Sequence, residues 1–92
     1  MRTLTLDVRR IDTVAALQRY IQFVMGFAEH YGRNLDALHD MLGEMDRDTR
    51  IVLITGEKQS GELAAYLPRL IRVIEDAARE NGHLKFEEKS EG

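Results

Sequence analysis

Three carboxylates recur every four residues near the middle of the chain, at Asp36, Asp40 and Glu44. On an α-helix this spacing stacks the three side chains along one side. Like charges four residues apart destabilise a helix by roughly 0.2–0.5 kcal/mol per pair, and no Lys or Arg lies four residues from Asp36 or Asp40 to offset that repulsion. The row is therefore either a solvated helix face or a surface that docks into a cationic site, since two aspartates one turn apart are spaced like neighbouring phosphates.

Acidic charge is concentrated around this row. Residues 29–48 contain six acids and two bases, whereas residues 1–20 contain four arginines and two aspartates. Arg33 lies three residues before Asp36, and Arg47 lies three residues after Glu44. We expect these two arginines to relieve the repulsion in part, because residues three apart are neighbours on a helix.

The composition is that of one soluble globular domain. The chain has 92 residues, of which 43% are hydrophobic and 32% are charged, and its formal net charge is −3. That charge has the wrong sign for a protein that binds the phosphate backbone of a nucleic acid. The chain has no cysteine, which excludes disulfides and thiolate metal sites and fits a reducing cytosol.

We expect neither a membrane-spanning segment nor an export signal in this chain. No stretch approaches the roughly 20 apolar residues of a membrane span, and Asp7 comes before any apolar signal-peptide stretch could form. We therefore expect a cytoplasmic protein without membrane contact. Residues 1–88 are expected to form the single domain, and residues 89–92 a charged C-terminal tail.

Two apolar periodicities organise the first third of the chain. Residues 3–8 alternate between apolar and polar, which predicts a half-buried strand. Apolar residues then recur at helical spacing over residues 14–25, with Thr13 as the N-cap and Gly26 ending the helix. Gly32 suits a positive φ in the connection that follows.

A second helix must position the acidic row. Asn34 is a good N-cap for it. Its apolar stripe lies nearly opposite the three carboxylates and comprises Leu35, Leu38, Leu42 and Met45. The polar residues 46–49 then predict an exit loop.

The second half of the chain predicts two further strands. Residues 51–54 are a continuous aliphatic run, typical of a strand that is buried on both sides or central in a parallel sheet. Residues 56–61 predict a loop and residues 62–66 a short helix. Pro68 suits the first turn of a separate final helix. Residues 83–87 alternate again and predict a third strand.

The order of these elements predicts an α/β fold. Strands separated by helical crossovers favour parallel pairing with right-handed connections. Asn81 and Gly82 end the last helix, and residues after Glu87 are charged or small and are expected to fray.

Other chemistry finds little support. Asp36, His39 and Asp40 could face a metal ion, but no fourth ligand is evident, so no metal or cofactor is expected. Residues 56–61 resemble half of a phosphate-binding loop, yet Glu62 stands where that motif needs lysine, and a flexible turn is the simpler reading. The three histidines are scattered and no serine lies in a nucleophile elbow, so the chain is not expected to be an enzyme.

The string HYGRNLDALHDML, from His30 to Leu42, resembles a known signature. In the barstar family a Tyr-Gly-x-Asn-Leu-Asp-Ala-Leu-x-Asp core opens the inhibitory helix. The similarity runs without a gap over residues 14–42. The strand at 51–54, the long final helix and the ending at residues 82–86 also resemble barstar-related inhibitors, so the resemblance covers most of residues 1–86.

This resemblance implies both a fold and a function. The fold would be a three-stranded parallel sheet in the order 1-2-3, packed with about four helices. The partner would be a basic, guanyl-specific microbial ribonuclease of the barnase type, which Asp40 would enter at the phosphate-binding site while Asp36 pairs with neighbouring basic groups. The free inhibitor is expected to be a monomer. The implied partner-binding residues are His30, Asn34, Leu35, Asp36, His39, Asp40, Gly43 and Glu44.

The chain departs from the family pattern where barstars carry aromatic residues. Histidines replace interface aromatics at two positions, a methionine replaces a tryptophan beyond the helix, and an alanine replaces an acid of the final helix. These positions are His30, His39, Met45 and Ala77. Asp76 or Glu80 could substitute for the missing acid.

Two functions therefore remain open. The first is inhibition of a microbial guanyl-specific ribonuclease by an acidic helix that blocks the active site, favoured by the retained Asn34, Asp36 and Asp40. The alternative is an immunity or regulatory interaction module of the same fold that binds a different basic protein, favoured by the lost aromatics.

Overall fold

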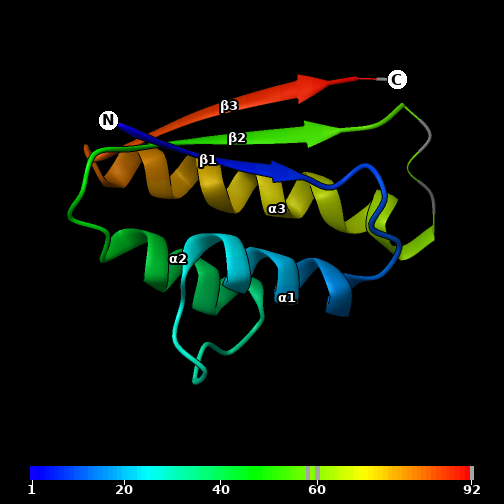
Figure 1. Cartoon of the computed structure of the whole chain (residues 1–92), viewed down its shortest axis with the longest axis horizontal. Helices are drawn as coiled ribbons and strands as arrows, with labels where there is room; N and C mark the ends of the chain where they lie inside the picture. The colour runs from blue at the N-terminus through cyan, green and yellow to red at the C-terminus, as the bar shows by residue number, and fades with distance from the viewer. Residues whose placement is uncertain (58, 60, 92) are drawn as a thin grey trace.

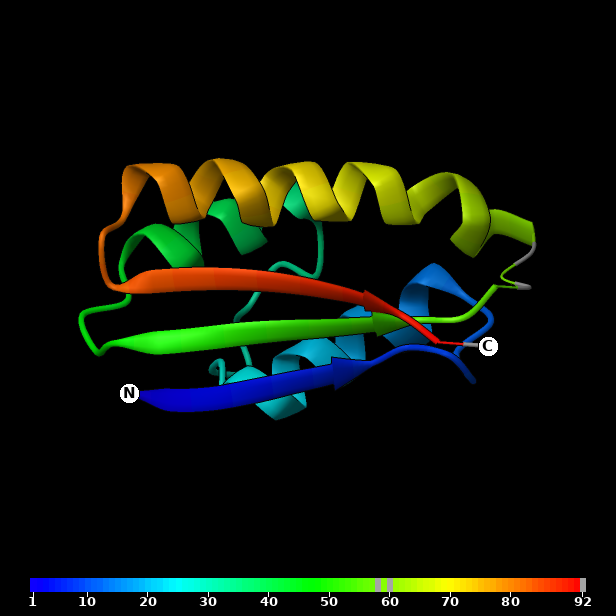
Figure 2. The ribbon, with the colours of Figure 1, turned by 90° about the horizontal axis from the view of Figure 1, so that it is seen from above.

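Three parallel strands pair in chain order in the computed structural model, which describes residues 1–57, 59 and 61–91. The expected α/β class, the parallel pairing and the strand order are confirmed. Figure 2 shows the central strand between its two neighbours. The strands are β1 (Arg2–Asp7), β2 (Thr49–Thr55) and β3 (Leu84–Ser90).

Three helices are found in the described part of the chain, and Figure 1 shows all of them on one side of the sheet. They are α1 (Val14–Met25), α2 (Leu35–Gly43) and α3 (Gly61–Glu80). Of the two settings expected for residues 51–54, the central position in a parallel sheet is the observed one. One face of β2 packs on the helices, while the other face points away from them and bears the exposed Arg50 and the buried Val52, so Ile51, Val52 and Leu53 are all buried. No helix in this part of the chain is long and apolar enough to cross a membrane.

One apolar core joins the sheet to the helices. In the register of the first strand pair, Leu4 lies opposite Ile51 and Leu6 opposite Leu53. Leu6 and Leu53 are buried together with Leu38 of α2. The alternation predicted for residues 3–8 thus matches the inner face of β1.

The helix ends form where the cap residues predict. Thr13 Oγ1 accepts from the Ala16 N–H at 3.1 Å and caps α1, and Gly26 ends that helix with φ 72°. Asn34 Oδ1 accepts from the Ala37 N–H at 2.7 Å and caps α2. Each cap satisfies a backbone group that has no partner within its helix.

The helix count of about four is wrong by one, because α3 runs unbroken through Pro68. A proline inside a helix costs about 3 kcal/mol, but Leu63, Leu67 and Leu70 continue one buried stripe across it, and each buried leucine contributes roughly 1.5–3 kcal/mol. Pro68 and Ala64 are both exposed, so water can reach the carbonyl that the proline leaves without an N–H partner.

Gly32 does not have the positive φ that we predicted. The left-handed residue is its neighbour Arg33, with φ 55°. Close packing instead favours a glycine at position 32, because a Cβ there would lie 3.2 Å from the Cβ of Ala37 and 3.3 Å from Nδ2 of Asn34. The glycine therefore lets the chain fold tightly against the first turn of α2.

Two other boundaries differ from expectation. The strand predicted at residues 83–87 continues to Ser90, whose backbone pairs with Thr55 of β2. The expected fraying after Glu87 is therefore not observed, and the boundary at residue 88 falls within β3. The predicted loop at 56–61 and the tail at 89–92 include residues 58, 60 and 92, which lie outside the described residues.

Candidate functional site

The acidic row occupies the solvent face of α2. Asp36, Asp40 and Glu44 are exposed, while Leu38 and Leu42 on the opposite side are buried. In the described part of the chain none of the three carboxylates forms an ion pair or a side-chain hydrogen bond. The face therefore presents carboxylates that no described residue neutralises through an ion pair.

Arg33 does not relieve this charge as we predicted. Its Nε donates to Oε1 of Gln22 on α1 at 2.9 Å, and no carboxylate of the described residues lies within ion-pair distance of it. Gln22 Nε2 also donates to the carbonyl of Ala28 at 2.8 Å. One glutamine on α1 thus fixes both ends of the loop that leads to α2.

A buried hydrogen-bond network supports the same loop from below. The Tyr31 hydroxyl donates to Oε1 of Gln18 at 2.5 Å, and Gln18 Nε2 donates to the Tyr66 hydroxyl of α3 at 2.7 Å. Gln18 is 1% exposed. Burial raises the pKa of the Tyr31 phenol, so Tyr31 remains a neutral donor. The network ties the residue before Gly32 to two helices.

The C-terminal end of α2 is held by Asn81, which we predicted only as the end of the last helix. Asn81 Nδ2 donates to the carbonyls of Leu42 and Met45, both at 2.9 Å. Asn81 Oδ1 also accepts from the His83 N–H at 3.0 Å. Asn81 therefore joins the ends of α2 and α3 to the start of β3, and no local sequence signal could reveal this, because its α2 partners lie 39 and 36 residues away.

The two predicted histidines lie in different settings. His39 Nε2 lies 3.0 Å from Oε1 of Glu80 on α3, so its ring is directed toward that helix. His30 is exposed in the loop before α2. Of the two acids considered for the final helix, Glu80 thus lies beside α2, whereas Asp76 pairs with Arg79 of its own helix.

The predicted site residues fall into three groups. Five of them belong to α2 itself, two are its exposed cap residues, and one lies in the preceding loop. In order, the groups are Leu35, Asp36, His39, Asp40 and Gly43; Asn34 and Glu44; and His30. Among the described residues, no three His, Cys, Asp or Glu side chains are grouped to hold a metal ion.

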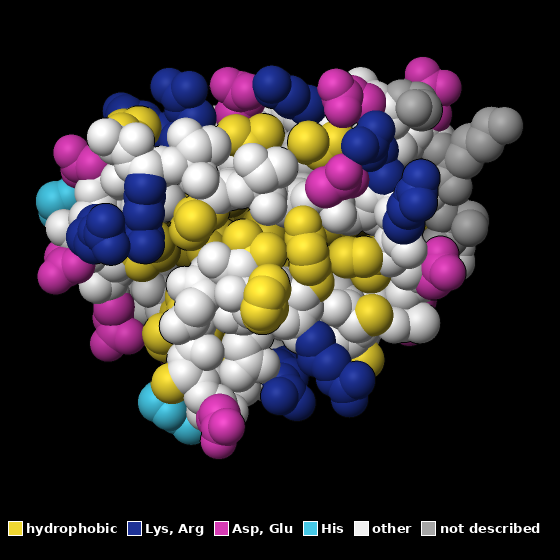
Figure 3. Space-filling model, in the orientation of Figure 1, with side chains coloured by type: hydrophobic (Ala, Val, Ile, Leu, Met, Phe, Trp, Pro, Cys, Tyr) yellow, Lys and Arg dark blue, Asp and Glu magenta, His cyan; other side chains and the backbone are white. Residues whose placement is uncertain are grey.

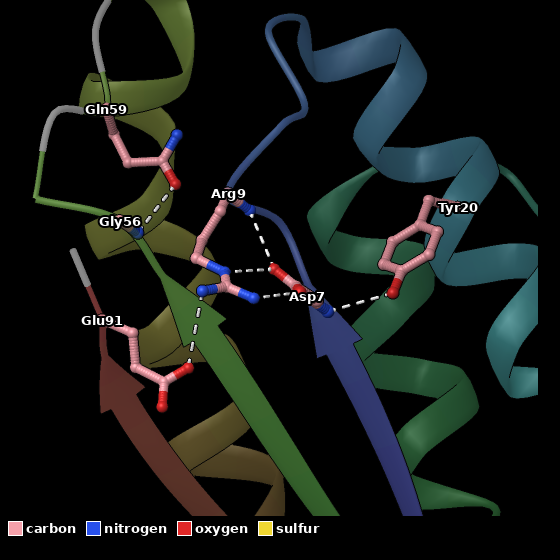
Figure 4. Close-up of polar contacts among 6 residues, drawn as sticks. All are labelled: Asp7, Arg9, Tyr20, Gly56, Gln59 and Glu91. Carbon is pink, nitrogen blue, oxygen red and sulfur yellow. Dashed lines mark hydrogen bonds and ion pairs between the residues drawn. The ribbon is translucent and has the colours of Figure 1, made fainter.

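A second polar cluster lies at the carboxyl end of the sheet, shown in Figure 4. Arg9 Nε and Nη2 donate to the two carboxylate oxygens of Asp7 at 2.9 and 2.8 Å, and these bonds lower the pKa of Asp7 to about 2. The Asp7 N–H donates to the Tyr20 hydroxyl at 3.0 Å, and Arg9 Nη1 lies 3.6 Å from Glu91. The charges of this cluster pair with one another and link the end of β1 to the end of β3. The acids on the α2 face have no such pairs among the described residues.

Fold and site together define a class: a small α/β protein that presents an unneutralised acidic helix on a firmly packed support. Residues 1–90 match the family model described as Barstar (barnase inhibitor). The chain is also 33% identical over 81 residues to the Bacillus subtilis (strain 168) protein named "Putative ribonuclease inhibitor YrdF", an alignment that covers 87% of this chain and 89% of that protein.

The chain belongs to the barstar family. The resemblance noted from residues 30–42 is thereby confirmed. Membership supports a barnase-inhibitor-like role with a ribonuclease as the partner, and it is consistent with the expectation that the chain is not an enzyme, because the proteins of this family are inhibitors.

Proposed function

We propose that this protein inhibits a guanyl-specific microbial ribonuclease by placing the acidic face of α2 in the active site of the enzyme. One observation carries the proposal: Asp36 and Asp40 are exposed on one side of α2 and have no ion-pair partner among the described residues. Free carboxylates on a helix can take the place of RNA phosphates opposite the cations of a ribonuclease. The body of the inhibitor then excludes RNA sterically.

The support behind α2 favours tight binding. Asn34 caps one end of the helix and Asn81 holds the other, while Leu38 and Leu42 anchor it in the core. A surface that is already ordered loses little conformational freedom on association, which preserves affinity.

The proposed contact set centres on Asp40, with Asp36 beside it. We propose that α3 contributes Glu80 to this contact set, because the contact between Glu80 and His39 brings Glu80 next to α2. The proposed set also includes His30, Asn34, Leu35, His39, Gly43 and Glu44. We further propose that the free protein is a cytoplasmic monomer that binds neither nucleic acid nor a membrane.

A titration of ribonuclease activity tests the proposal directly. Purified barnase and a panel of other basic microbial ribonucleases would be assayed on RNA while the inhibitor concentration is raised. Stoichiometric loss of cleavage for at least one enzyme is expected. If no enzyme of the panel is inhibited at micromolar inhibitor, the proposal fails.

The helix mechanism is tested by comparing Asp40→Ala with Glu29→Ala, a change in an exposed acid of the loop before α2. Removing one partner of a buried charge pair at an interface costs about 2–5 kcal/mol, a range drawn in part from complexes of this family. Asp40→Ala should therefore raise the inhibition constant on the order of 100-fold, and Glu29→Ala should change it far less. Equal losses for both variants would rule out this docking mode.

The alternative, an immunity or regulatory module for another basic protein, is favoured by one observation. The His39 ring pairs with Glu80 and is 40% exposed, so at that position α2 offers a partner a partly exposed imidazole in place of the larger aromatic ring of the family pattern. Two results together would support the alternative. No ribonuclease of the panel would be inhibited, and a basic toxin encoded beside this chain would bind the protein that retains Asp40.

A further inference from the structure

Arg33 has an unusual backbone conformation. It is the one residue other than glycine with a positive φ, 55°, in the described part of the chain. Left-handed backbone is unfavourable for arginine and persists where the surroundings hold it, often at functional positions. The bond from its Nε to Gln22 fixes the side chain at the junction of α1 and α2.

Two shallow grooves meet at this arginine. One lies along the C-terminal half of α1 and the loop after it, and the other lies at the N-terminal end of α2 beside α3. The first is lined by Arg19, Gln22, Phe23, Gly26, Phe27 and Arg33. The second includes Arg33, Leu35, Asp36, Tyr66 and Arg69. Because Arg33 lines both grooves, they adjoin at this residue, and the second groove reaches Asp36 at the start of the acidic face of α2.

This surface combines positive charge with an exposed aromatic ring. Phe23 is 85% exposed. Arg19, Arg33 and Arg69 form no ion pair with any described carboxylate, and the guanidinium carbon of Arg69 lies 5.8 Å from the centre of the Tyr66 ring. Figure 3 shows basic side chains gathered on the lower side of the molecule, beside the histidine and acidic side chains of the loop tip.

We propose that Arg19, Phe23, Arg33 and Arg69, termed the arginine surface, form a second contact area for the ribonuclease. The inference rests on the proposed function and concerns which enzyme is bound. The arginine surface takes an acidic side chain of the enzyme with an apolar neighbour, at the rim of the basic cleft that receives Asp36 and Asp40. An enzyme whose rim is uniformly basic is repelled there, so the arginine surface selects among ribonucleases.

The rate constant that changes when a positive charge is removed distinguishes a local contact at Arg33 from long-range electrostatic attraction. Removing a positive charge from an acidic inhibitor increases its overall attraction to a basic enzyme and speeds association. A local contact between Arg33 and an enzyme carboxylate has the opposite consequence, because losing it speeds dissociation. The two effects can therefore be told apart by measuring both rate constants.

The test uses stopped-flow kinetics with a ribonuclease that the wild-type chain inhibits. Arg33→Gln and Phe23→Ala are each expected to dissociate roughly five- to tenfold faster than wild type, the size of effect expected when an anchoring side chain of an interface is removed. Arg33→Lys, which keeps the charge, should recover part of the loss. The matched control is Arg72→Gln, an exposed arginine of α3 outside both grooves, which should dissociate at the wild-type rate.

Each outcome decides the proposal. Phe23→Ala should keep the wild-type Tm because the ring is exposed, so its dissociation rate remains informative if Arg33→Gln folds poorly. Suppose that wild type inhibits and Asp40→Ala does not, but Phe23→Ala and Arg33→Gln bind as tightly as wild type or more tightly. The arginine surface is then not a contact area, while the proposed function stands. If wild type inhibits no ribonuclease, the proposed function and the arginine surface fall together.

Discussion

At the scale of single residues, the structure separates acids with partners from acids without. His83 Nδ1 lies 2.9 Å from Asp48 and lowers the pKa of that carboxyl, and Arg9 does the same for Asp7. Asp36 and Asp40 form no such pair with any described residue. We expect Asp36 and Asp40 to meet a partner because they lie one turn apart on the exposed side of α2, where both carboxylates can pair with cations that the partner supplies.

The pairing of Asp7 predicts a pH-dependent contribution to stability. The hydrogen bonds from Arg9 hold the pKa of Asp7 at about 2, below its ordinary value of 3.8. A depressed pKa means that the ionised carboxylate stabilises the folded state above pH about 4 and that this gain is lost as the pH falls through about 2. Asp7→Asn should therefore lower the Tm at pH 7 and have little effect at pH 2.

Thermal unfolding followed by circular dichroism at both pH values checks this. The effect should be small, because the pair is partly exposed to solvent. Asp12→Asn, a nearby exposed aspartate without an ion pair among the described residues, is the control and should leave the Tm unchanged at both pH values. A Tm deficit of Asp7→Asn that persists at pH 2 would show that the Arg9 pair is not its cause.

At the scale of elements, α2 is held at both ends by side chains. Asn34 caps its start, and Asn81 binds carbonyls at its end. Gly32 lets the preceding loop approach the first turn so closely that a Cβ would lie 3.2 Å from Ala37. The acidic face is thus presented by a helix whose ends are fixed by other parts of the molecule.

Two glycine substitutions should therefore change the stability in opposite directions. Gly32→Ala should lower the free energy of unfolding by about 1–3 kcal/mol, because the new methyl group overpacks the site. Gly43→Ala should raise it by up to about 0.5 kcal/mol, because alanine favours a helix over glycine and no atom lies within 4 Å of the new Cβ. Urea denaturation measures both values, and a Gly32→Ala variant as stable as wild type would contradict the packing argument.

At the scale of the whole molecule, charge is distributed unevenly. The net charge is −3, α2 carries a row of exposed acids without ion pairs among the described residues, and the arginine surface lies next to it. A basic enzyme is attracted over long range by the acidic face, and its orientation is then set by neighbouring patches of opposite sign. The same distribution that speeds encounter can thus restrict which partners dock.

This distribution predicts a strong dependence of association on salt. The association rate constant with an inhibited ribonuclease should fall by at least about tenfold when NaCl rises from about 10 mM to about 500 mM, since screening shortens the Debye length. The dissociation rate constant should change less, because charges buried at the interface are screened weakly. Stopped-flow measurements across the salt series test this, and an association rate constant independent of salt would exclude electrostatic steering.

Local patterns accounted for much of the architecture. The caps at Thr13 and Asn34 and the end at Gly26 were predictable because each acts within a few residues of the backbone it satisfies. Parallel pairing in chain order followed from strands alternating with helices and from the family resemblance. The outward direction of Asp36 and Asp40 followed from helical periodicity alone, since their i, i+4 spacing opposes the apolar stripe.

Other features were decided by the tertiary structure. Pro68 remains inside α3 because leucines on both sides of it pack into one core, which outweighs the local preference for a break. Arg33 turns to Gln22, eleven residues away, rather than to Asp36, and Asn81 reaches carbonyls 36 and 39 residues away. Spacing along the chain tells which way a helical side chain points, but the partner it finds depends on which distant residues the fold brings beside it.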